Sequence, residues 1–171
     1  MNDQHAEITW RDGKTPVSTR FDDPYFSVDD GLAETRHVFL ADNDLPARFC
    51  DGFHIAELGF GTGLNLLVVW EAWLAAGIDG PLHFTSFEAF PMAKEDMARA
   101  HQAFPAFEGQ RDALLSRHDR DESCDRVCGD LDTTLLIIPR PQTLGRLPLR
   151  HTEAALIRKL DHLADAQGVA F

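Results

Sequence analysis

The sequence predicts an α/β domain with a parallel sheet, from three features that follow one another along the chain. The short apolar segment 53–58 has the length and the flanking turn residues of a buried strand. Glycines at 59, 61 and 63 follow it directly, and the next segment, 64–76, is apolar almost all round, as in a helix packed on a sheet. A second strand-like segment at 81–88 completes a strand–turn–helix–strand unit, which is typical of parallel sheets.

The first 52 residues are expected to form a small β-rich extension packed on this core. Asp12-Gly13 separates the β-prone segments 8–10 and 16–18, which predicts a hairpin because glycine adopts positive φ at little cost. Residues 31–40 predict a short helix with Asp29 or Asp30 near its cap.

The segments after 88 predict less regular structure. Residues 91–104 predict a helix with Pro91 near its first turn, and the charged residues 108–126 predict a solvated helix and loop. Residues 126–130 are compatible with a brief strand and turn, and the prolines at 139, 141 and 148 predict a loop over 137–150. A helix is expected at 152–164 and the start of a strand at 168–171. We therefore expect one domain, with a core at 53–171 that is atypical at 133–150 and ends early.

The composition limits the classes of function. With 171 residues the chain is long enough for one domain with a real core. It contains no apolar run of the roughly 20 residues that a membrane-spanning helix needs and no secretory signal at its start, so no membrane partner is expected. Its net charge of −12 and its three scattered lysines disfavour generic nucleic-acid binding, so an RNA substrate would require a local arginine patch or a partner protein.

The three cysteines favour a cytoplasmic, reducing location rather than a disulfide framework. Cys124 and Cys128 lie near His118, but without a second cysteine pair this spacing does not predict a metal site.

The segment from Glu57 to Gly63 is the clearest candidate for a ligand-binding site. Alternate glycines bring the backbone close to a ligand, and the helix after them offers free N–H groups and a positive dipole end. A nicotinamide dinucleotide fingerprint needs Gly-x-Gly-x-x-Gly, whereas this spacing is Gly-x-Gly-x-Gly, which disfavours an NAD-dependent oxidoreductase. The acid at position 57 suits S-adenosylmethionine, because the amino-acid end of that cofactor carries an ammonium group.

Glu88 ends the next predicted strand. In a doubly wound sheet this position lies beside the first crossover, at the edge where ligands bind. A carboxylate there can accept hydrogen bonds from both ribose hydroxyls of an adenosine.

Four motifs in order resemble a known family: 22–27 (DDPYFS), 31–40 (GLAETRHVFL), 57–65 (ELGFGTGLN) and 87–91 (FEAFP). Together they are similar to the methyltransferase domain of the tRNA 5-methylaminomethyl-2-thiouridine biosynthesis protein family, over about residues 8–117. The resemblance implies a Rossmann-like class I S-adenosylmethionine-dependent methyltransferase fold whose C-terminal strands are missing or divergent here. It also implies methylation of the amine of 5-aminomethyl-2-thiouridine at the tRNA wobble position. Many members are fused to an FAD-dependent oxidoreductase, so such a protein is a possible partner.

The resemblance also implies the cofactor site. Tyr25 either closes over the methionine end of the cofactor or packs the extension on the core. The family continues with a strand that carries Gly-Asp, and Gly129-Asp130 is the candidate counterpart, with Asp130 near the adenine. The expected cofactor-binding residues are Tyr25, Glu57, Gly59, Phe60, Gly61, Thr62, Gly63, Asn65, Glu88 and Asp130.

The reaction itself leaves an alternative open. The family's next segment, Asp-Gly-Phe-x-Pro, has no counterpart here, because the proline- and arginine-rich residues 133–150 occupy its place. No catalytic residue is therefore assigned. The chain is either an active methyltransferase or a shortened, non-catalytic homologue that binds cofactor or a partner without turnover. A sheet that lacks terminal strands exposes an edge, and a homodimer could cover it.

Overall fold

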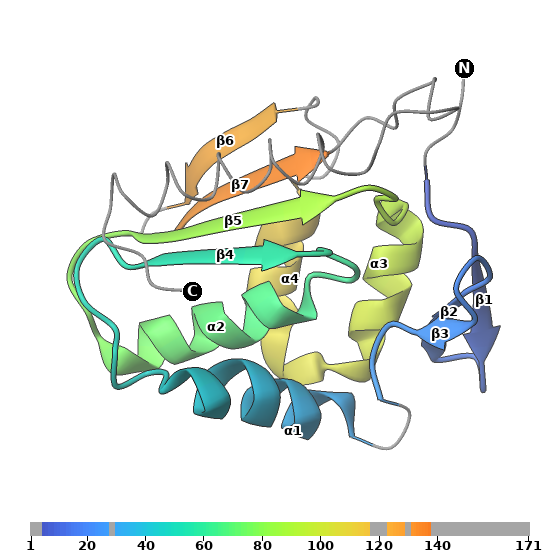
Figure 1. Ribbon diagram of the computed structural model, residues 1–171, viewed down its shortest axis with the longest axis horizontal. Coiled ribbons are helices and arrows are strands. Elements are labelled where there is room, and N and C mark those ends of the chain that lie inside the picture. The colour runs from blue at the N-terminus through green and yellow to red at the C-terminus, as the bar shows by residue number, and fades with distance from the viewer. Residues whose placement is uncertain (1–4, 28–29, 117–122, 129–130, 138–171) are drawn as a thin grey trace, which may run out of the picture. The chain divides into compact units, whose positions relative to one another are not determined.

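The computed structural model describes residues 5–27, 30–116, 123–128 and 131–137. All of them fall within one compact unit, residues 1–138. Figure 1 shows its two sheets, a four-stranded sheet with helices packed against it and a small three-stranded sheet beside the ends of its strands. The protein is thus mixed α/β, with a largely parallel main sheet.

The main sheet has the strand order β4–β5–β7–β6. Its strands are β4 (His54–Leu58), β5 (Leu82–Glu88), β6 (Ser123–Cys128) and β7 (Leu131–Ile137). β4, β5 and β7 run parallel, and β6 is antiparallel to β7. The register pairs Leu58 with Phe87 and Glu88 with Ile137, so the three parallel strands end together at what we call the carboxyl edge.

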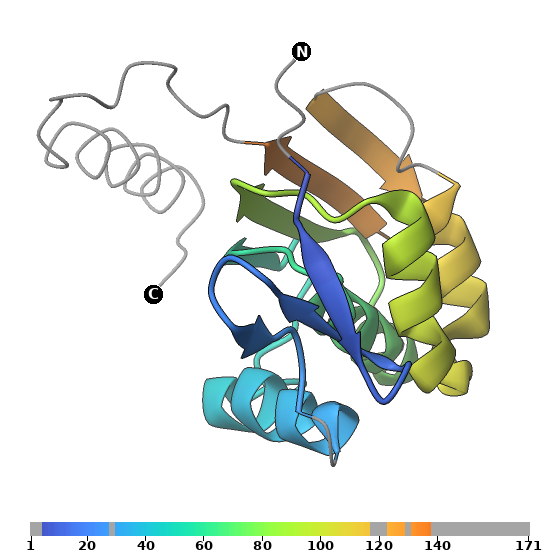
Figure 2. The same cartoon turned by 90° about the vertical axis from the view of Figure 1, so that its right-hand side faces the viewer.

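The helices α2 (Leu64–Ala76), α3 (Lys94–Ala100) and α4 (Glu108–Leu115) lie on the same face of this sheet in Figures 1 and 2. Short 3₁₀ turns, His101–Ala103 and Pro105–Phe107, connect α3 to α4. α2 is buried almost all round because the sheet covers one side and the N-terminal helices cover the other. It ends as the sequence predicts, at Gly77 with φ 62°.

The first 52 residues contain both strands and helices. A hairpin of β1 (Ile8–Arg11) and β2 (Thr15–Ser18) turns at Asp12 and Gly13, both at positive φ, and β3 (Asp23–Pro24) joins β2. α1 (Gly31–Thr35) is capped by Asp30, whose Oδ1 accepts from the Ala33 N–H at 2.9 Å. It continues as a π-helix, Arg36–Leu40, and a 3₁₀ turn, Ala41–Asn43.

Three expectations are corrected beyond residue 88. Pro91 precedes α3 rather than lying in its first turn, since Ala93 is still extended. Residues 123–126 are part of β6 rather than of a solvated helix and loop. Residues 131–137 form β7, a strand that the charge and proline pattern did not predict although the run Thr-Thr-Leu-Leu-Ile has high β-propensity.

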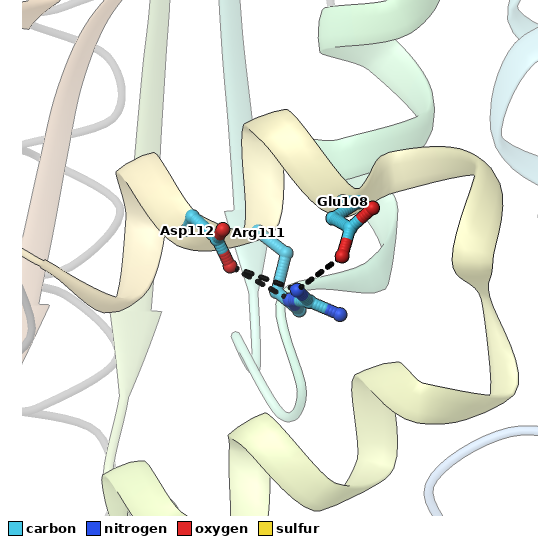
Figure 3. Close-up of polar contacts among 3 residues, drawn as sticks. All are labelled: Glu108, Arg111 and Asp112. Atoms are coloured by element: carbon cyan, nitrogen blue, oxygen red, sulfur yellow. Dashed lines mark hydrogen bonds and ion pairs between the residues drawn. The ribbon is translucent and has the colours of Figure 1, made fainter.

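The helix expected within the charged segment is present as α4. Its Arg111 pairs with Glu108 at 3.4 Å and with Asp112 at 2.9 Å, as Figure 3 shows. Its apolar side, Ala113, Leu114 and Leu115, packs on the core. The segment is therefore amphipathic, and only one side of it is solvated.

Candidate functional site

The glycine turn joins β4 to α2 at the carboxyl edge. Gly59, Gly61 and Gly63 have φ of 87°, 55° and 74°, values that side-chain-bearing residues rarely adopt. The Gly63 N–H donates to the Phe60 carbonyl at 2.8 Å, and α2 begins at the next residue. The turn therefore directs the first N–H groups of a 13-residue helix toward this edge.

Glu88 bridges the end of β5 to this turn. Its Oε2 accepts from the Gly61 N–H at 3.0 Å, and its Oε1 accepts from the Phe90 N–H at 2.8 Å. A carboxylate has about four lone-pair sites. Both oxygens can therefore accept further hydrogen bonds while they hold the turn in place.

Glu57 lies on β4, one residue before the strand ends, and is buried, at 8% exposure. Its Oε2 accepts from Asn65 Nδ2 at 3.1 Å, and Ser86 is its neighbour in register on β5, although its buried Oε1 makes no hydrogen bond of good geometry. Burial raises the pKa of Glu57 to about 7; hydrogen bonding by Asn65 and by the neighbouring Ser86 hydroxyl opposes this increase, and the Glu88 carboxylate adds slightly to it. A buried, incompletely satisfied carboxyl group of this kind is typical of ligand sites.

Tyr25 brings the N-terminal extension onto the turn. A Cβ at Gly61 would lie 3.2 Å from the Tyr25 ring, so only glycine fits under it without displacement. Burial and the neighbouring Glu88 carboxylate raise the pKa of Tyr25, and its hydroxyl therefore remains protonated.

Most of the residues expected at the site are brought together, with different roles for their side chains. Tyr25, Glu57, Asn65, Glu88 and the three glycines surround the turn through the contacts given above. Phe60 and Thr62 are buried at 7% and 3% exposure, with Phe60 in the core, so these two contribute backbone.

Asp130 lies outside the described residues. The described residues on either side of Gly129-Asp130, Cys128 and Leu131, pair with each other. Leu131 is level with Leu82, at the opposite end of β5 from Glu88.

Sequence reasoning missed a histidine that supports the turn from behind. His101 is 1% exposed, and its Nε2 lies 2.6 Å from the Thr62 carbonyl oxygen. Burial lowers the pKa of His101, so the neutral ring donates from Nε2 because a carbonyl can only accept. No sequence signal links His101 to Thr62, since the two are 39 residues apart and meet only when α3 packs on the sheet.

Sequence reasoning also missed an aromatic cluster beside Glu88. The Arg20 guanidinium lies over the Phe90 ring, 4.5 Å from its centroid, and Phe21 meets Phe90 edge to face at 6.1 Å. Among the described residues there is no cluster of three or more potential metal ligands and no helix that could span a membrane.

Comparison with known proteins confirms the resemblance. No family model matches the chain. Curated proteins named tRNA 5-methylaminomethyl-2-thiouridine biosynthesis bifunctional protein MnmC match it, and that of Vibrio cholerae is 52% identical over 111 residues, 59% of this chain. Those of Leptospira borgpetersenii and Aeromonas salmonicida are 45% and 46% identical over 65% and 66% of the chain. The matched region is only 16–18% of the length of these relatives.

A solved structure supports the fold. The crystal structure of MNMC2 from Aquifex aeolicus has a TM-score of 0.54, covers 86% of this chain and is 19% identical to it. This chain covers 47% of that one. The main sheet and its helices therefore have a fold similar to that of MNMC2, and at 45–52% identity the chain is similar to part of proteins named for tRNA 5-methylaminomethyl-2-thiouridine biosynthesis.

Proposed function

We propose that the chain binds S-adenosylmethionine on a Rossmann-like class I methyltransferase fold and acts on the modified wobble uridine of tRNA. The observation that carries the proposal is the pair of acidic side chains at the glycine turn, Glu57 near the end of β4 and Glu88 at the end of β5. The proposed substrate, the amine of 5-aminomethyl-2-thiouridine, follows from the family resemblance, and it is supported by similarity to proteins named for tRNA 5-methylaminomethyl-2-thiouridine biosynthesis.

Each group at the turn matches a different part of the cofactor. Glu88 retains lone pairs that can accept hydrogen bonds from two ribose hydroxyls while it holds Gly61. When it is ionised, the Glu57 carboxylate provides a negative oxygen for an ammonium group. The first N–H groups of α2 suit a carboxylate. The residues present therefore fit S-adenosylmethionine.

Methyl transfer requires that the attacking amine be aligned with the methyl group of the cofactor and that water be excluded from the site. Bound S-adenosylmethionine supplies a methyl group on a sulfonium, which a neutral amine can attack. Within the described residues, Tyr25 packs over Gly61 and excludes water from one side of the turn. The amine must also lose a proton, and we assign no residue to that step.

Isothermal titration with S-adenosylmethionine tests the cofactor site. We expect micromolar binding by the chain and at least tenfold weaker binding by Glu88→Gln and Gly61→Ala. Glu71→Gln removes a charge from the exposed pair with Arg36, and Gly77→Ala alters a positive-φ glycine with open space around it, so both should bind like wild type. No binding by a well-folded wild-type chain would refute the proposed cofactor.

A non-catalytic homologue is the second candidate. It is favoured by the absence of a counterpart to the family's Asp-Gly-Phe-x-Pro segment. A methyl-transfer assay on tRNA that carries the free amine separates the two, because the non-catalytic protein would bind cofactor without labelling the RNA. The proposal includes an FAD-dependent oxidoreductase as the supplier of that amine, and a homodimer as a possible assembly.

A further inference from the structure

The aromatic cluster beside Glu88 combines a cation with two rings. The Arg20 guanidinium carbon lies 4.5 Å from the Phe90 ring centroid and 5.7 Å from that of Phe21. The two rings meet edge to face at 62°. Guanidinium groups and aromatic rings arranged in this way are the groups on which unstacked nucleobases stack.

Phe21 is exposed although folding favours its burial. It is 64% exposed, and the other exposed large apolar side chains among the described residues, Val38, Leu58 and Leu74, are aliphatic. Its backbone is held in place, because the Phe21 N–H donates to Ser18 Oγ at 3.3 Å and Asp22 after it has φ 52°. The ring is thus presented to solvent by a defined turn between β2 and β3.

The other guanidinium–aromatic contacts in the described chain are different in kind. Arg99 lies 3.9 Å over Trp10 but also donates to the Gly13 carbonyl, and Trp10 is half-buried. Arg48 lies 5.8 Å over Phe53, which packs on the core through Phe49. Both contacts connect parts of the fold, whereas Phe21 leaves most of its ring open to solvent.

The cluster is attached to the candidate cofactor site. Phe90 is two residues beyond Glu88, and its N–H donates to Glu88 Oε1 at 2.8 Å. Tyr25, four residues after Phe21, packs against Gly61 in the glycine turn. A base that rests on the cluster would therefore be held next to the glycine turn, close to the groups proposed to bind the methyl donor.

We propose that Arg20, Phe21 and Phe90 form a stacking site for an unpaired base of the RNA substrate. The proposal rests on the proposed function for the identity of the RNA. Charge favours RNA as the occupant, because Arg20 attracts a polyanion and repels a sulfonium cofactor. It also contributes one arginine toward the local positive charge that a chain with a net charge of −12 requires for RNA.

Fluorescence anisotropy with two RNA probes tests the site in the full chain. One probe is a labelled tRNA anticodon stem-loop with uridine at the wobble position, and the other is the same stem closed as a duplex without a loop. We expect Phe21→Leu and Arg20→Gln to weaken binding of the stem-loop by about tenfold, since base–aromatic stacking is lost. Phe21→Tyr, which keeps an aromatic face, should bind like wild type.

The controls separate stacking from general effects. Arg48→Gln removes an equivalent charge elsewhere, and Leu74→Ala alters another exposed apolar side chain, so neither should change stem-loop affinity. Duplex affinity should change less than twofold in Phe21→Leu and Phe21→Tyr, which alter no charge, whereas Arg20→Gln also removes a general attraction for RNA. The affinity for S-adenosylmethionine should also stay within twofold of wild type in Phe21→Leu.

Two of the other outcomes overturn the stacking site, and a third overturns the proposed cofactor alone. Equal stem-loop binding by Phe21→Leu and wild type, or no stem-loop binding by wild type, removes the stacking site. A loss of cofactor binding in Phe21→Leu with unchanged RNA binding would assign the cluster to the cofactor's adenine instead. If wild type binds RNA through Phe21 but does not bind S-adenosylmethionine, the proposed cofactor fails and the stacking site stands.

Discussion

The raised pKa of Glu57 has a measurable effect on stability. Burial moves this pKa from its ordinary value of 4.5 to about 7, so between these values the folded chain holds a proton that the unfolded chain has released. Because the unfolded state then binds fewer protons, the free energy of unfolding falls as pH rises from 4.5 to 7. At about 1.36 kcal/mol per pKa unit, ionisation of Glu57 lowers the free energy of unfolding by roughly 3 kcal/mol above pH 7 and has no effect below pH 4.5.

Glu57→Gln isolates this cost. The neutral amide keeps the shape of the side chain and cannot ionise, and Asn65 can rotate its amide to offer an oxygen. We expect the variant to be about 2–3 kcal/mol more stable than wild type at pH 8 and equal to it within about 0.5 kcal/mol at pH 4.5. Urea denaturation at half-unit pH steps measures the difference.

The difference in the free energy of unfolding between Glu57→Gln and wild type cancels the effects of other titrating groups. His101 has a lowered pKa, so it destabilises both proteins as pH falls below 6.5. Glu71→Gln serves as the control, because it removes a charge from an exposed pair and should shift stability by less than about 1 kcal/mol at every pH. A difference between Glu57→Gln and wild type that does not change between pH 4.5 and 8 would refute the reasoning.

The affinity for the proposed cofactor should depend on pH in the opposite direction to stability. The ionised form of Glu57 is the one that attracts an ammonium group, so the affinity of wild type for S-adenosylmethionine should rise as pH increases toward 7. It should fall again above about pH 8, where an α-amino group loses its proton. Stability and affinity should therefore change in opposite directions between pH 5 and 7, and titration calorimetry across that range measures the second slope.

Two further predictions concern the support of the glycine turn. Gly63→Ala should lower the free energy of unfolding by about 2–4 kcal/mol, because a Cβ at Gly63 would lie 2.7 Å from the Phe60 ring. Gly59→Ala should lower it by only about 1 kcal/mol, because open space surrounds Gly59. Chemical denaturation compares the two variants, and equal losses would contradict the packing argument. His101→Leu should lower the free energy of unfolding by about 1–3 kcal/mol, because the Thr62 carbonyl loses its hydrogen-bond donor. His101→Gln can place an N–H near the same position and should restore much of that stability. Thermal denaturation of both histidine variants checks this, and a Gln variant no better than Leu would contradict it.

Local patterns predicted the centre of this fold well. The strand–turn–helix–strand unit from β4 to β5 lies within a residue of its expected bounds, because flanking glycines and apolar runs mark each boundary. The hairpin at Asp12-Gly13 and the Asp30 cap were also readable, since each depends on residues within three positions of one another. Around the turn, the glycines and Glu57 were predicted from such local spacing, Glu88 from its place at the end of the next strand, and Tyr25 and Asn65 from the family resemblance.

Contacts between distant segments were not predictable. His101 meets Thr62, and Arg20 meets Phe90, only after helices and loops pack on the sheet, and neither pair has a spacing that marks it. β7 was missed because its apolar residues follow a charged segment and precede prolines, which suggested loop. Its place in the sheet depends on pairing with β5, a strand more than 40 residues earlier, and sequence periodicity does not encode such pairing.

The position of β4 in the sheet leads to a prediction about assembly. Among the described residues β4 is an outer strand, paired only with β5. The Gly59 N–H donates to the Phe87 carbonyl, and the His83 N–H to the Phe53 carbonyl, so odd-numbered residues of this stretch bond to β5. The backbone groups of Ala56 and Leu58 therefore face the open edge, and the Leu58 side chain is 65% exposed.

If two copies of the chain pair through their β4 edges, the dimer should be disrupted by substitutions that remove backbone hydrogen-bonding groups at Ala56 or Leu58, and not by those at the odd-numbered residues that bond to β5. Ala56→Pro removes an N–H that the bonds to β5 do not use, and proline is tolerated on edge strands for this reason. We expect light scattering to show a dimer for wild type and a monomer for Ala56→Pro, with the far-ultraviolet circular dichroism unchanged. Ile55→Pro, the matched control, breaks a bond to β5 and should instead lower the melting temperature. A wild-type monomer, or a dimer that persists in Ala56→Pro, would contradict pairing through this edge.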